Sequence, residues 1–218
     1  MNFDLFADDD VVPARGDESL APGAAVLRGF ALDCAPELLE AIRIVTASAP
    51  FRHLVTPGGF TMSVAMTNCG EAGWVSDRTG YRYDRIDPDS GKPWPPMPSV
   101  FVSLAQAAAA RVGFSPFEPD VCLINRYVPG TRLSLHQDRD EKGYVDPIVS
   151  VSLGLPAVFQ WGGDKRSDRP QRVPLAHGDV VVWGGPSRLR FHGVLPLKDG
   201  EHPVVGRQRL NLTFRKAL

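Results

Sequence analysis

The sequence predicts a mostly β protein with flanking helices, an α+β chain whose strands form a jelly roll or a related barrel. Two observations predict this class. Beyond residue 120, seven or eight short apolar segments follow one another at short intervals. Turn-forming residues separate them, since the chain of 218 residues contains 21 Gly and 20 Pro. Many short strands divided by turns are typical of jelly rolls and barrels.

The length and the composition predict one domain. A chain of 218 residues with 43% hydrophobic residues can bury a core of its own. Its first twenty residues differ from the rest, because they hold six acidic residues and a single Arg. We therefore expect an acidic mobile leader over residues 1–20 and a single domain over residues 21–218.

Two helices are expected before the strands. The first begins at Pro36, carries Leu, Ile and Val at i, i+4 and i+7 spacing, and ends near Pro50. The second begins near Pro98 and ends at Gly113, because glycine favours the C-terminal end of a helix.

Residues 51–98, between the two helices, are the least regular part of the sequence. Thr-Pro-Gly-Gly at residues 56–59 opens this segment, and five prolines close it. Its interior is rich in aromatic residues and Met. Segments this long without regular structure are usually functional or disordered, and the aromatic content favours a lid.

The strands of the predicted jelly roll lie in the C-terminal half. Pro129-Gly130 is a turn dipeptide that joins the first two of them. Strands are expected over residues 120–130, 131–138, 147–156, 157–161, 172–177, 179–185, 187–197 and 207–215.

Charge and cysteine content limit the classes of function. A net charge of −1 argues against non-specific clamping of duplex nucleic acid over a wide surface. Outside the leader the chain carries 23 basic and 19 acidic residues, which allows a local basic patch. Cys34, Cys69 and Cys122 are far apart in sequence, which favours reduced thiols over a disulfide framework or a zinc ribbon.

The sequence lacks the patterns of secretion and of membrane insertion. Its N-terminus is acidic and has no charged-then-apolar signal pattern. No stretch approaches the ~18 apolar residues of a membrane span. We therefore expect a soluble protein of the cytoplasm.

His136-Gln137-Asp138, followed later by His192, is the strongest chemical pattern in the sequence. Side chains two positions apart on a strand point to the same face, and His192 lies on a later strand before a turn. Two imidazoles and one carboxylate are the ligands expected for a non-haem Fe(II) oxygenase. Taken alone, His-x-Asp also fits a surface strand with a structural hydrogen bond. The absence of a thiolate disfavours a structural zinc site.

The C-terminal strand suggests the co-substrate. Arg209, Asn211, Thr213 and Arg215 alternate along it and so share one face. A planar guanidinium can grip a carboxylate with two parallel hydrogen bonds, so two arginines suit a dicarboxylate. Together with the metal ligands, this pattern predicts a 2-oxoglutarate-dependent dioxygenase.

Four further polar residues allow two interpretations each. Asn125 and Tyr127 could contact the co-substrate if their face looks into the barrel, or they are ordinary strand residues. Asp140 and Glu141 follow the metal ligands and resemble a solvated acidic turn. Asp140 could instead accept a hydrogen bond from a substrate amine or attract a cationic substrate.

Long stretches of the chain resemble the AlkB family of oxidative DNA dealkylases, essentially throughout the sequence beyond the leader. The stretches that carry the resemblance are TPGGFTMSVAMTNCG, GYRYDRIDP, KPWPPMP, CLINRYVPG, LSLHQDRDE, PIVSVSLGLPAVFQ, HGDVVVWGG and LNLTFR. This resemblance implies a double-stranded β-helix (jelly-roll) core with a nucleotide-recognition lid over about residues 51–98. It also implies Fe(II) as the metal and 2-oxoglutarate and O₂ as co-substrates.

The implied reaction is oxidative demethylation of N-alkylated bases such as 1-methyladenine and 3-methylcytosine, preferably in single-stranded DNA. Its products are formaldehyde, succinate and CO₂ beside the repaired base. Such bases carry a positive charge, which favours an indole face and a nearby carboxylate. The base must leave the stack to reach a buried metal.

The resemblance also implies roles for individual residues. The metal ligands it implies are His136, Asp138 and His192. The 2-oxoglutarate contacts it implies are Asn125, Tyr127, Arg209, Asn211 and Arg215. Trp74 is implied to stack on the flipped base opposite His136, and Asp140 to meet the exocyclic amine. The remaining substrate contacts in this interpretation are Met66, Tyr81, Tyr83 and Arg166.

Two residues depart from the family pattern. Phe60 stands where a family member carries Tyr in the lid, so a hydrogen bond from that hydroxyl is lost. Leu210 replaces an aromatic residue, and strand alternation turns it away from the two arginines.

Three other functions stay open from the sequence. The same chemistry could act on RNA or tRNA, because a flipped base looks much alike in both nucleic acids. A hydroxylase of proteins or small molecules would keep the metal ligands without needing Trp74. A non-catalytic sensor would bind the metal or 2-oxoglutarate without turnover. In each case we expect a monomer without an obligate protein partner or a membrane.

Overall fold

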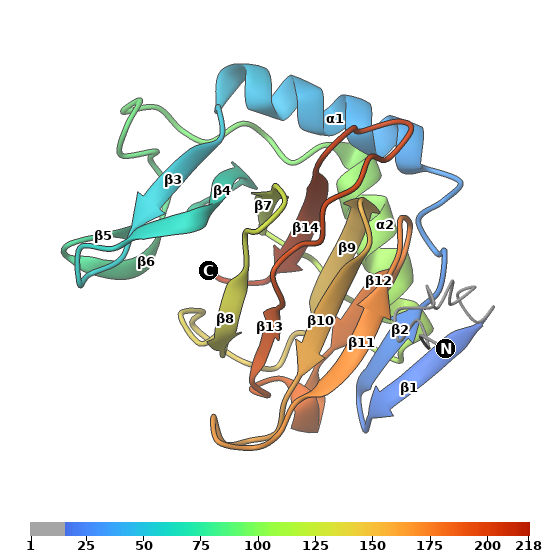
Figure 1. The fold of residues 1–218 in the computed structure, drawn as a ribbon. Coiled ribbons are helices and arrows are strands. Elements are labelled where there is room, and N and C mark those ends of the chain that lie inside the picture. Colours follow the sequence, from blue (N-terminus) through green and yellow to red (C-terminus); the bar gives the residue numbers. More distant parts are fainter. Residues whose placement is uncertain (1–15) are drawn as a thin grey trace, which may run out of the picture.

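The structure, a computed structural model, describes residues 16–218 and contains two α-helices flanking antiparallel sheets (Figure 1). The elements are β1 (Asp17–Ala21), β2 (Ala24–Leu27), α1 (Ala35–Ser48), β3 (Arg52–Val55), β4 (Thr61–Gly70), β5 (Gly73–Asp77), β6 (Gly80–Asp84), α2 (Ser99–Arg111), β7 (Val121–Tyr127), β8 (Leu133–His136), β9 (Ile148–Gly154), β10 (Ala157–Trp161), β11 (Gln171–Leu175), β12 (Val180–Trp183), the 3₁₀ turn η1 (Gly185–Ser187), β13 (His192–Val194) and β14 (Arg209–Arg215). The predicted mostly β fold with flanking helices is confirmed.

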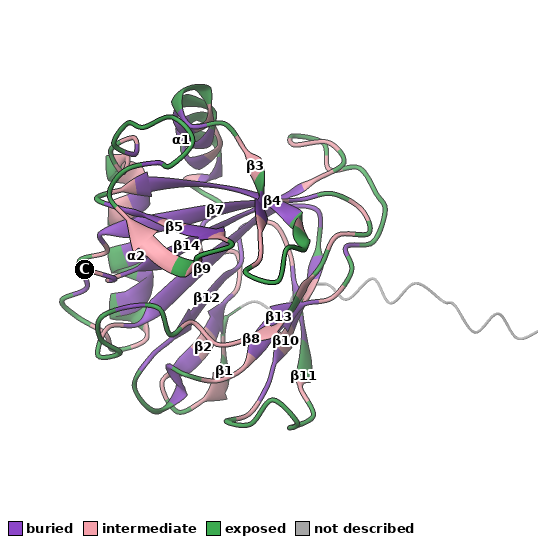
Figure 2. Cartoon of the chain, turned by 90° about the vertical axis from the view of Figure 1, so that its left-hand side faces the viewer, coloured by how far each residue is buried: buried purple, intermediate pink, exposed green. Residues whose placement is uncertain are grey.

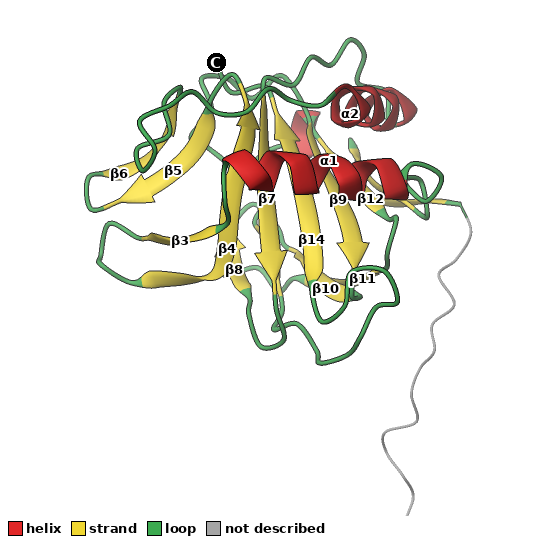
Figure 3. Ribbon diagram, turned by 90° about the horizontal axis from the view of Figure 1, so that it is seen from above, coloured by secondary structure: helices red, strands yellow, loops and turns green. Residues whose placement is uncertain are grey.

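Two sheets pack face to face to make the jelly-roll core. The large sheet has eight strands in the order β1-β2-β12-β9-β14-β7-β4-β3, and the small sheet has four in the order β11-β10-β13-β8. Consecutive neighbours within both sheets pair antiparallel. Seen from above, α1 and α2 cover the outer face of the large sheet (Figure 3). The sheet is therefore buried on both faces, as its mostly buried strands show (Figure 2).

Strand β14 shows how the sequence divides these two faces. Leu210, Leu212 and Phe214 belong to the hydrophobic cluster that the helices form with the large sheet. The alternate polar residues of the same strand point between the two sheets and line a cavity there. Alternation along an extended strand thus places an apolar face outward and a charged face inward, as the sequence predicts.

The segment 51–98 is more regular than the sequence suggests. Its strand β4 runs for ten residues and pairs with β7 in the large sheet, so the expectation of irregular structure is wrong for Thr61–Gly70, while the role of the segment as a lid stays a prediction. Most of β4 is buried without period-2 alternation, which removes the usual signal of a strand. Strands β5 and β6 form a separate two-stranded sheet that extends from the body of the molecule (Figure 1).

The predicted leader lies mostly outside the described residues. Its last residues are part of the fold, because β1 begins at Asp17 and pairs with β2 at one edge of the large sheet. The predicted end of the leader at residue 20 is therefore wrong. Among residues 16–218, no helix combines the length and the apolar character needed to cross a membrane.

Candidate active site

Two strands of the small sheet bring the predicted metal ligands together. His136 ends β8, and His192 begins β13 directly opposite it in the antiparallel register. Their ring centroids lie 4.4 Å apart. Asp138 completes the group, and the ligand atoms of the three residues all lie within 4.8 Å of one another. Two imidazoles and a carboxylate at this spacing suit a divalent iron with open coordination positions.

Each imidazole is oriented through its second nitrogen. Nδ1 of His136 lies 2.9 Å from the Ser134 carbonyl, and Nδ1 of His192 lies 3.0 Å from the Arg190 carbonyl. Donation from Nδ1 to these carbonyls leaves Nε2 of each ring as the metal-binding atom. Burial, reinforced by His136, lowers the pKa of His192 to about 4, which keeps this ring neutral and able to bind a metal.

Asp138 is held by charge rather than by the strand. It lies two residues beyond the end of β8, so strand alternation does not fix its direction, contrary to the prediction. Instead, Nη2 of Arg215 donates to its Oδ2 at 2.6 Å, and Nε does so at 3.1 Å. Burial opposes ionisation here, but Arg215 and the two imidazoles outweigh it, so the pKa of Asp138 lies well below its usual range.

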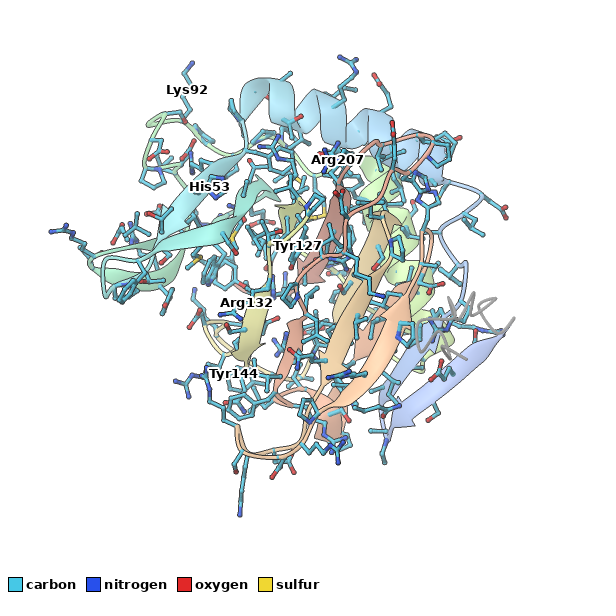
Figure 4. All side chains as sticks on the ribbon, viewed as in Figure 1. His53, Lys92, Tyr127, Arg132, Tyr144 and Arg207 are labelled. Atoms are coloured by element: carbon cyan, nitrogen blue, oxygen red, sulfur yellow. The ribbon has the colours of Figure 1, made fainter. Side chains whose placement is uncertain are left out.

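Behind the metal ligands, β14 and β7 present the predicted co-substrate residues to one cavity. Asn211 pairs with Asn125 and Arg209 with Tyr127 in the register of the two strands. The cavity has a volume of about 950 Å³ and also contains the metal ligands. Tyr127 lies in the middle of the molecule (Figure 4). The interpretation of Asn125 and Tyr127 as residues that face the barrel interior is therefore correct.

Within residues 16–218, Arg209 is a buried cation without an acidic partner. Its side chain is 1% exposed, its Nη2 donates to Ser152 Oγ at 2.9 Å, and its guanidinium carbon lies 4.9 Å from the Tyr127 ring centre. Nε and Nη1 have no hydrogen-bond partner among the described residues. Burial lowers the pKa of Arg209. Two unpaired donors on a buried cation fit a carboxylate of a bound dicarboxylate.

Arg215 has a different environment at the other end of β14. Besides Asp138, it contacts Glu141, with Nε 3.2 Å from Oε1. Its Nη1 has no hydrogen-bond partner among residues 16–218, although the side chain is buried. Arg215 can therefore offer one donor to a co-substrate while it fixes the metal ligand.

The two asparagines differ in their free hydrogen-bonding groups. Asn211 donates from Nδ2 to Ser150 Oγ at 2.8 Å and to the Val151 carbonyl at 2.9 Å. Both of its donors are thus used within the protein, so Asn211 shapes the cavity floor. Asn125 donates to Asn211 Oδ1 at 3.3 Å, and its own Oδ1 has no partner in the described chain. Asn125 is the amide with free capacity toward the cavity.

The mouth of the same cavity carries the predicted substrate residues. Trp74 on β5 stacks on Tyr81 of β6, with ring centroids 5.5 Å apart and planes 12° from parallel. The Trp74 indole donates from Nε1 to Asp140 Oδ2 at 2.8 Å. Asp140 was predicted to meet a substrate amine, and here it accepts from an indole of the wall. Met66, buried on β4, and exposed Arg166 also line the cavity.

Tyr83 and Glu141 belong to a buried ionic cluster between the mouth and the metal ligands. Tyr83 donates to Glu141 Oε1 at 2.9 Å, and burial raises the pKa of Tyr83. Glu141 is 7% exposed, so the interpretation of this residue as part of a solvated acidic turn is wrong. Arg215 and Arg188 both lie beside it. No local sequence pattern predicts that Glu141 is buried or that Arg188 lies beside it.

The fold and this site together define a 2-oxoglutarate- and iron-dependent oxygenase. The family described as "2OG-Fe(II) oxygenase superfamily" matches residues 23–215. An "Alpha-ketoglutarate-dependent dioxygenase AlkB" of Salmonella typhimurium is 59% identical over 99% of this chain and 98% of its own length. The solved structure of OsALKBH1 superposes with a TM-score of 0.79 at 30% identity, covering 91% of this chain and 100% of that one.

The chain belongs to the AlkB family of α-ketoglutarate-dependent dioxygenases. A more distant relative, the mouse "Nucleic acid dioxygenase ALKBH1", is 35% identical over 59% of this chain and 33% of its own length. Fe(II), 2-oxoglutarate and O₂ are accordingly its cofactor and co-substrates, as the metal ligands predict.

Proposed function

We propose that this dioxygenase demethylates N-alkylated bases, such as 1-methyladenine and 3-methylcytosine, preferably in single-stranded DNA. The observation that carries the proposal is the hydrogen-bonded pair of Trp74 and Asp140 on the wall of the cavity that holds the metal ligands. An indole face and a carboxylate both favour a cationic base over its neutral parent. The name of the mouse relative supports a nucleic-acid substrate.

In this proposal the protein supplies position and a dry cavity. His136, Asp138 and His192 would hold Fe(II), which with 2-oxoglutarate and O₂ supplies the oxidant for the methyl carbon. Hydroxylation there gives a hemiaminal that releases formaldehyde and the repaired base. Trp74 would stack on the flipped base opposite His136, and this contact aims the methyl group at the metal.

The two arginines divide the dicarboxylate between them in this proposal. Arg215 bonds Asp138, so it would hold the carboxylate nearer the metal. Arg209 lies six residues along β14 with two unpaired donors, so it would hold the distal carboxylate. The Tyr127 ring completes the wall beside it.

Single strands are the proposed preference because the mouth offers stacking rather than a broad cationic surface. Tyr81 is 47% exposed and continues the aromatic surface of Trp74 outward. Tyr83 and Met66 would contact the nucleotide from the inner side, and Arg166 from the far rim. Stacking contributes about 1–3 kcal/mol per base. A protein with almost no net charge can therefore still bind a single strand.

We further propose that the enzyme acts as a cytoplasmic monomer. All three cysteines are free thiols, and Cys69 and Cys122 are fully buried in neighbouring strands. Reduced cysteines are the normal state in the cytosol.

The test is formaldehyde release from a single-stranded oligonucleotide that contains 1-methyladenine, with Fe(II), ascorbate and 2-oxoglutarate each omitted in turn. We expect release that requires Fe(II) and 2-oxoglutarate. Parallel reactions use the same lesion in duplex DNA and in RNA, and faster RNA turnover would move the substrate class to RNA. Binding of 2-oxoglutarate without turnover on any methylated oligonucleotide would leave a sensor or a hydroxylase of other substrates.

A further inference from the structure

Arg188 is a buried arginine that lies outside the cavity and yet touches the segment that carries the metal ligand. It follows η1 in the connection between β12 and β13 and is 3% exposed. Its Nη1 donates to the Asp138 carbonyl at 2.8 Å, and its Nε donates to the Asp146 carbonyl at 3.1 Å. One guanidinium thus bridges two carbonyls that stand eight residues apart, at the two ends of the 138–146 loop.

This loop has no regular secondary structure to fix its shape. Residues 137–147 contain no helix or strand, so their backbone groups need partners from elsewhere. The guanidinium carbon of Arg188 lies 5.5 Å from the Tyr144 ring centre, and the Tyr144 hydroxyl donates to the Arg139 carbonyl at 2.9 Å. Figure 4 labels Tyr144 on this part of the chain, below β8. Arg188 therefore lies under the loop and contacts both of its ends and its middle.

The 138–146 loop carries the carboxylates of Asp138 and Asp140, which lie two residues apart in the chain. Asp138 faces the histidines, and Asp140 accepts the Trp74 indole two residues later. Glu141 follows Asp140 directly in the chain, and its Oε2 lies 3.3 Å from Nη2 of Arg188. Without Arg188, the buried Glu141 carboxylate would keep Tyr83 as a donor, and its only charged partner among the described residues would be Arg215, which also holds Asp138. A shift of Glu141 would therefore be transmitted to the metal ligand.

The neighbours of Arg188 tie the same connection to the second metal strand. The Leu189 carbonyl accepts from Gln137 Nε2, and the Arg190 carbonyl accepts from His192 Nδ1 at 3.0 Å. Residues 188–190 thus touch both halves of the metal site. Partners of this kind orient metal ligands and commonly matter nearly as much as the ligands themselves.

We propose that Arg188 is a positioning residue that fixes Asp138 and Asp140 relative to each other, and so couples oxidant formation to the presence of the methylated base. The part that concerns Asp140 rests on the proposed function. Loss of Arg188 lets the loop shift, so 2-oxoglutarate is consumed without demethylation, and the ascorbate of the assay then supplies the two electrons that the methyl group otherwise gives, so that the second oxygen atom leaves as water. The excess appears as succinate and CO₂ formed without an equivalent of formaldehyde.

The experiment compares Arg188→Met with wild type and with Arg28→Met as the matched control. Arg28 is a partly buried arginine whose side chain is 9% exposed, and its Nη1 donates to Asp179 at 2.8 Å and to the Pro174 carbonyl at 2.6 Å, away from the cavity. Two readouts are measured on each protein. They are the Mn(II) affinity of the metal-free protein by calorimetry, and the ratio of succinate to formaldehyde on the 1-methyladenine oligonucleotide.

For Arg188→Met we expect Mn(II) affinity to fall by roughly 10-fold or more and the succinate to formaldehyde ratio to rise several-fold. Arg28→Met should lower the melting temperature while both readouts stay at wild-type values. If Arg188→Met changes only the melting temperature, Arg188 is an ordinary core residue and the proposal is overturned.

Arg188→Lys covers the case in which the Met variant does not fold. A lysine keeps the charge beside Glu141, but one ammonium cannot span the two carbonyls. We expect changes in the same direction, and wild-type Mn(II) affinity and coupling in this variant would overturn the proposal by themselves. The Mn(II) readout is independent of the substrate, so a wild-type enzyme that releases no formaldehyde would refute the proposed function while this inference is still tested.

Discussion

The inner end of the cavity and its mouth are held by different kinds of structure. At the inner end, Arg209 and Arg215 come from β14, a strand with neighbours on both sides, and are 1% and 6% exposed. At the mouth, Tyr81 comes from the two-stranded β5-β6 sheet and is 47% exposed, and Phe60 is 77% exposed. The proposed chemistry thus lies on a central strand, whereas the proposed recognition of the base lies on the two-stranded β5-β6 sheet.

This difference teaches which residues should affect catalysis and which should affect binding. Groups fixed in a central strand are preorganised and lose little freedom when a ligand arrives. Groups on an exposed hairpin can adjust to different bases, and each contributes a modest stacking energy. Substitutions at the inner end should therefore remove turnover or co-substrate binding, and those at the mouth should weaken substrate binding alone.

The largest effect is expected for Asp138→Asn. The amide keeps the shape and can still accept from Arg215, so the fold should survive better than with Ala. It loses the negative charge that the metal needs, and we expect turnover to fall by roughly 10³-fold, because a catalytic metal contributes several kcal/mol. Formaldehyde release and Mn(II) calorimetry measure the effect.

Circular dichroism is the control for that variant, since an unfolded protein would give the same loss. A folded Asp138→Asn protein that keeps wild-type turnover would remove Asp138 from the metal site. It would also undo the contrast between a catalytic inner end and a binding mouth.

Arg209→Met tests the inner end without touching the metal ligands. Two charge-assisted hydrogen bonds to a carboxylate would be lost, so we expect the dissociation constant for 2-oxoglutarate to rise by about 100-fold. The melting temperature of the ligand-free protein should stay the same or rise, because the variant removes a buried charge that has no acidic partner. Calorimetry with 2-oxoglutarate and thermal unfolding are the two measurements.

Arg215→Met is the comparison for Arg209→Met. Because Arg215 bonds Asp138, its loss should weaken Mn(II) and 2-oxoglutarate binding together and lower stability. Equal effects of the two variants on Mn(II) affinity would contradict the proposal that Arg215 supports the metal site and Arg209 does not.

Trp74→Ala should act at the mouth alone. Loss of one stacked base contact is expected to raise KM for the methylated oligonucleotide by roughly 5- to 150-fold, which corresponds to about 1–3 kcal/mol. The affinity for 2-oxoglutarate should not change, since Trp74 lies on the separate β5-β6 sheet. If both constants change together, the indole is part of the inner site and the stacking role is wrong.

The sequence predicted the inner end better than the mouth, for a physical reason. Period-2 alternation places Arg209 and Arg215 on one face regardless of tertiary context, and turn residues mark the ends of the strands. The triad follows because His136 and His192 lie opposite each other in neighbouring strands. The candidate metal ligands and the shared face of the two arginines were therefore readable from local pattern together with the family resemblance.

Other features depend on contacts that no local pattern contains. Strand β4 is buried with little alternation, and Asp138 lies beyond its strand and is held by Arg215. In the sequence, Glu141 resembles a surface acid. Only the folded chain brings Arg188 and Tyr83 beside it from distant positions. Charge pairing across long sequence separations fixes these residues, so only the folded structure could place them.

The smallest expected effect belongs to Phe60, which departs from the family pattern and so tests how adaptable the mouth is. Phe60 is 77% exposed at the turn between β3 and β4 and lines the cavity mouth. For Phe60→Ala we expect KM for a methylated oligonucleotide to rise by about 5-fold, the low end of a stacking contribution, with kcat unchanged. Phe60→Tyr restores the family hydroxyl and should stay close to wild type. Free 1-methyladenosine provides the control, because it has no neighbouring base for Phe60 to contact. An equal rise in KM for the free nucleoside would mean that Phe60 contacts the flipped base itself. The part of the cavity that binds the base would then extend outward as far as Phe60.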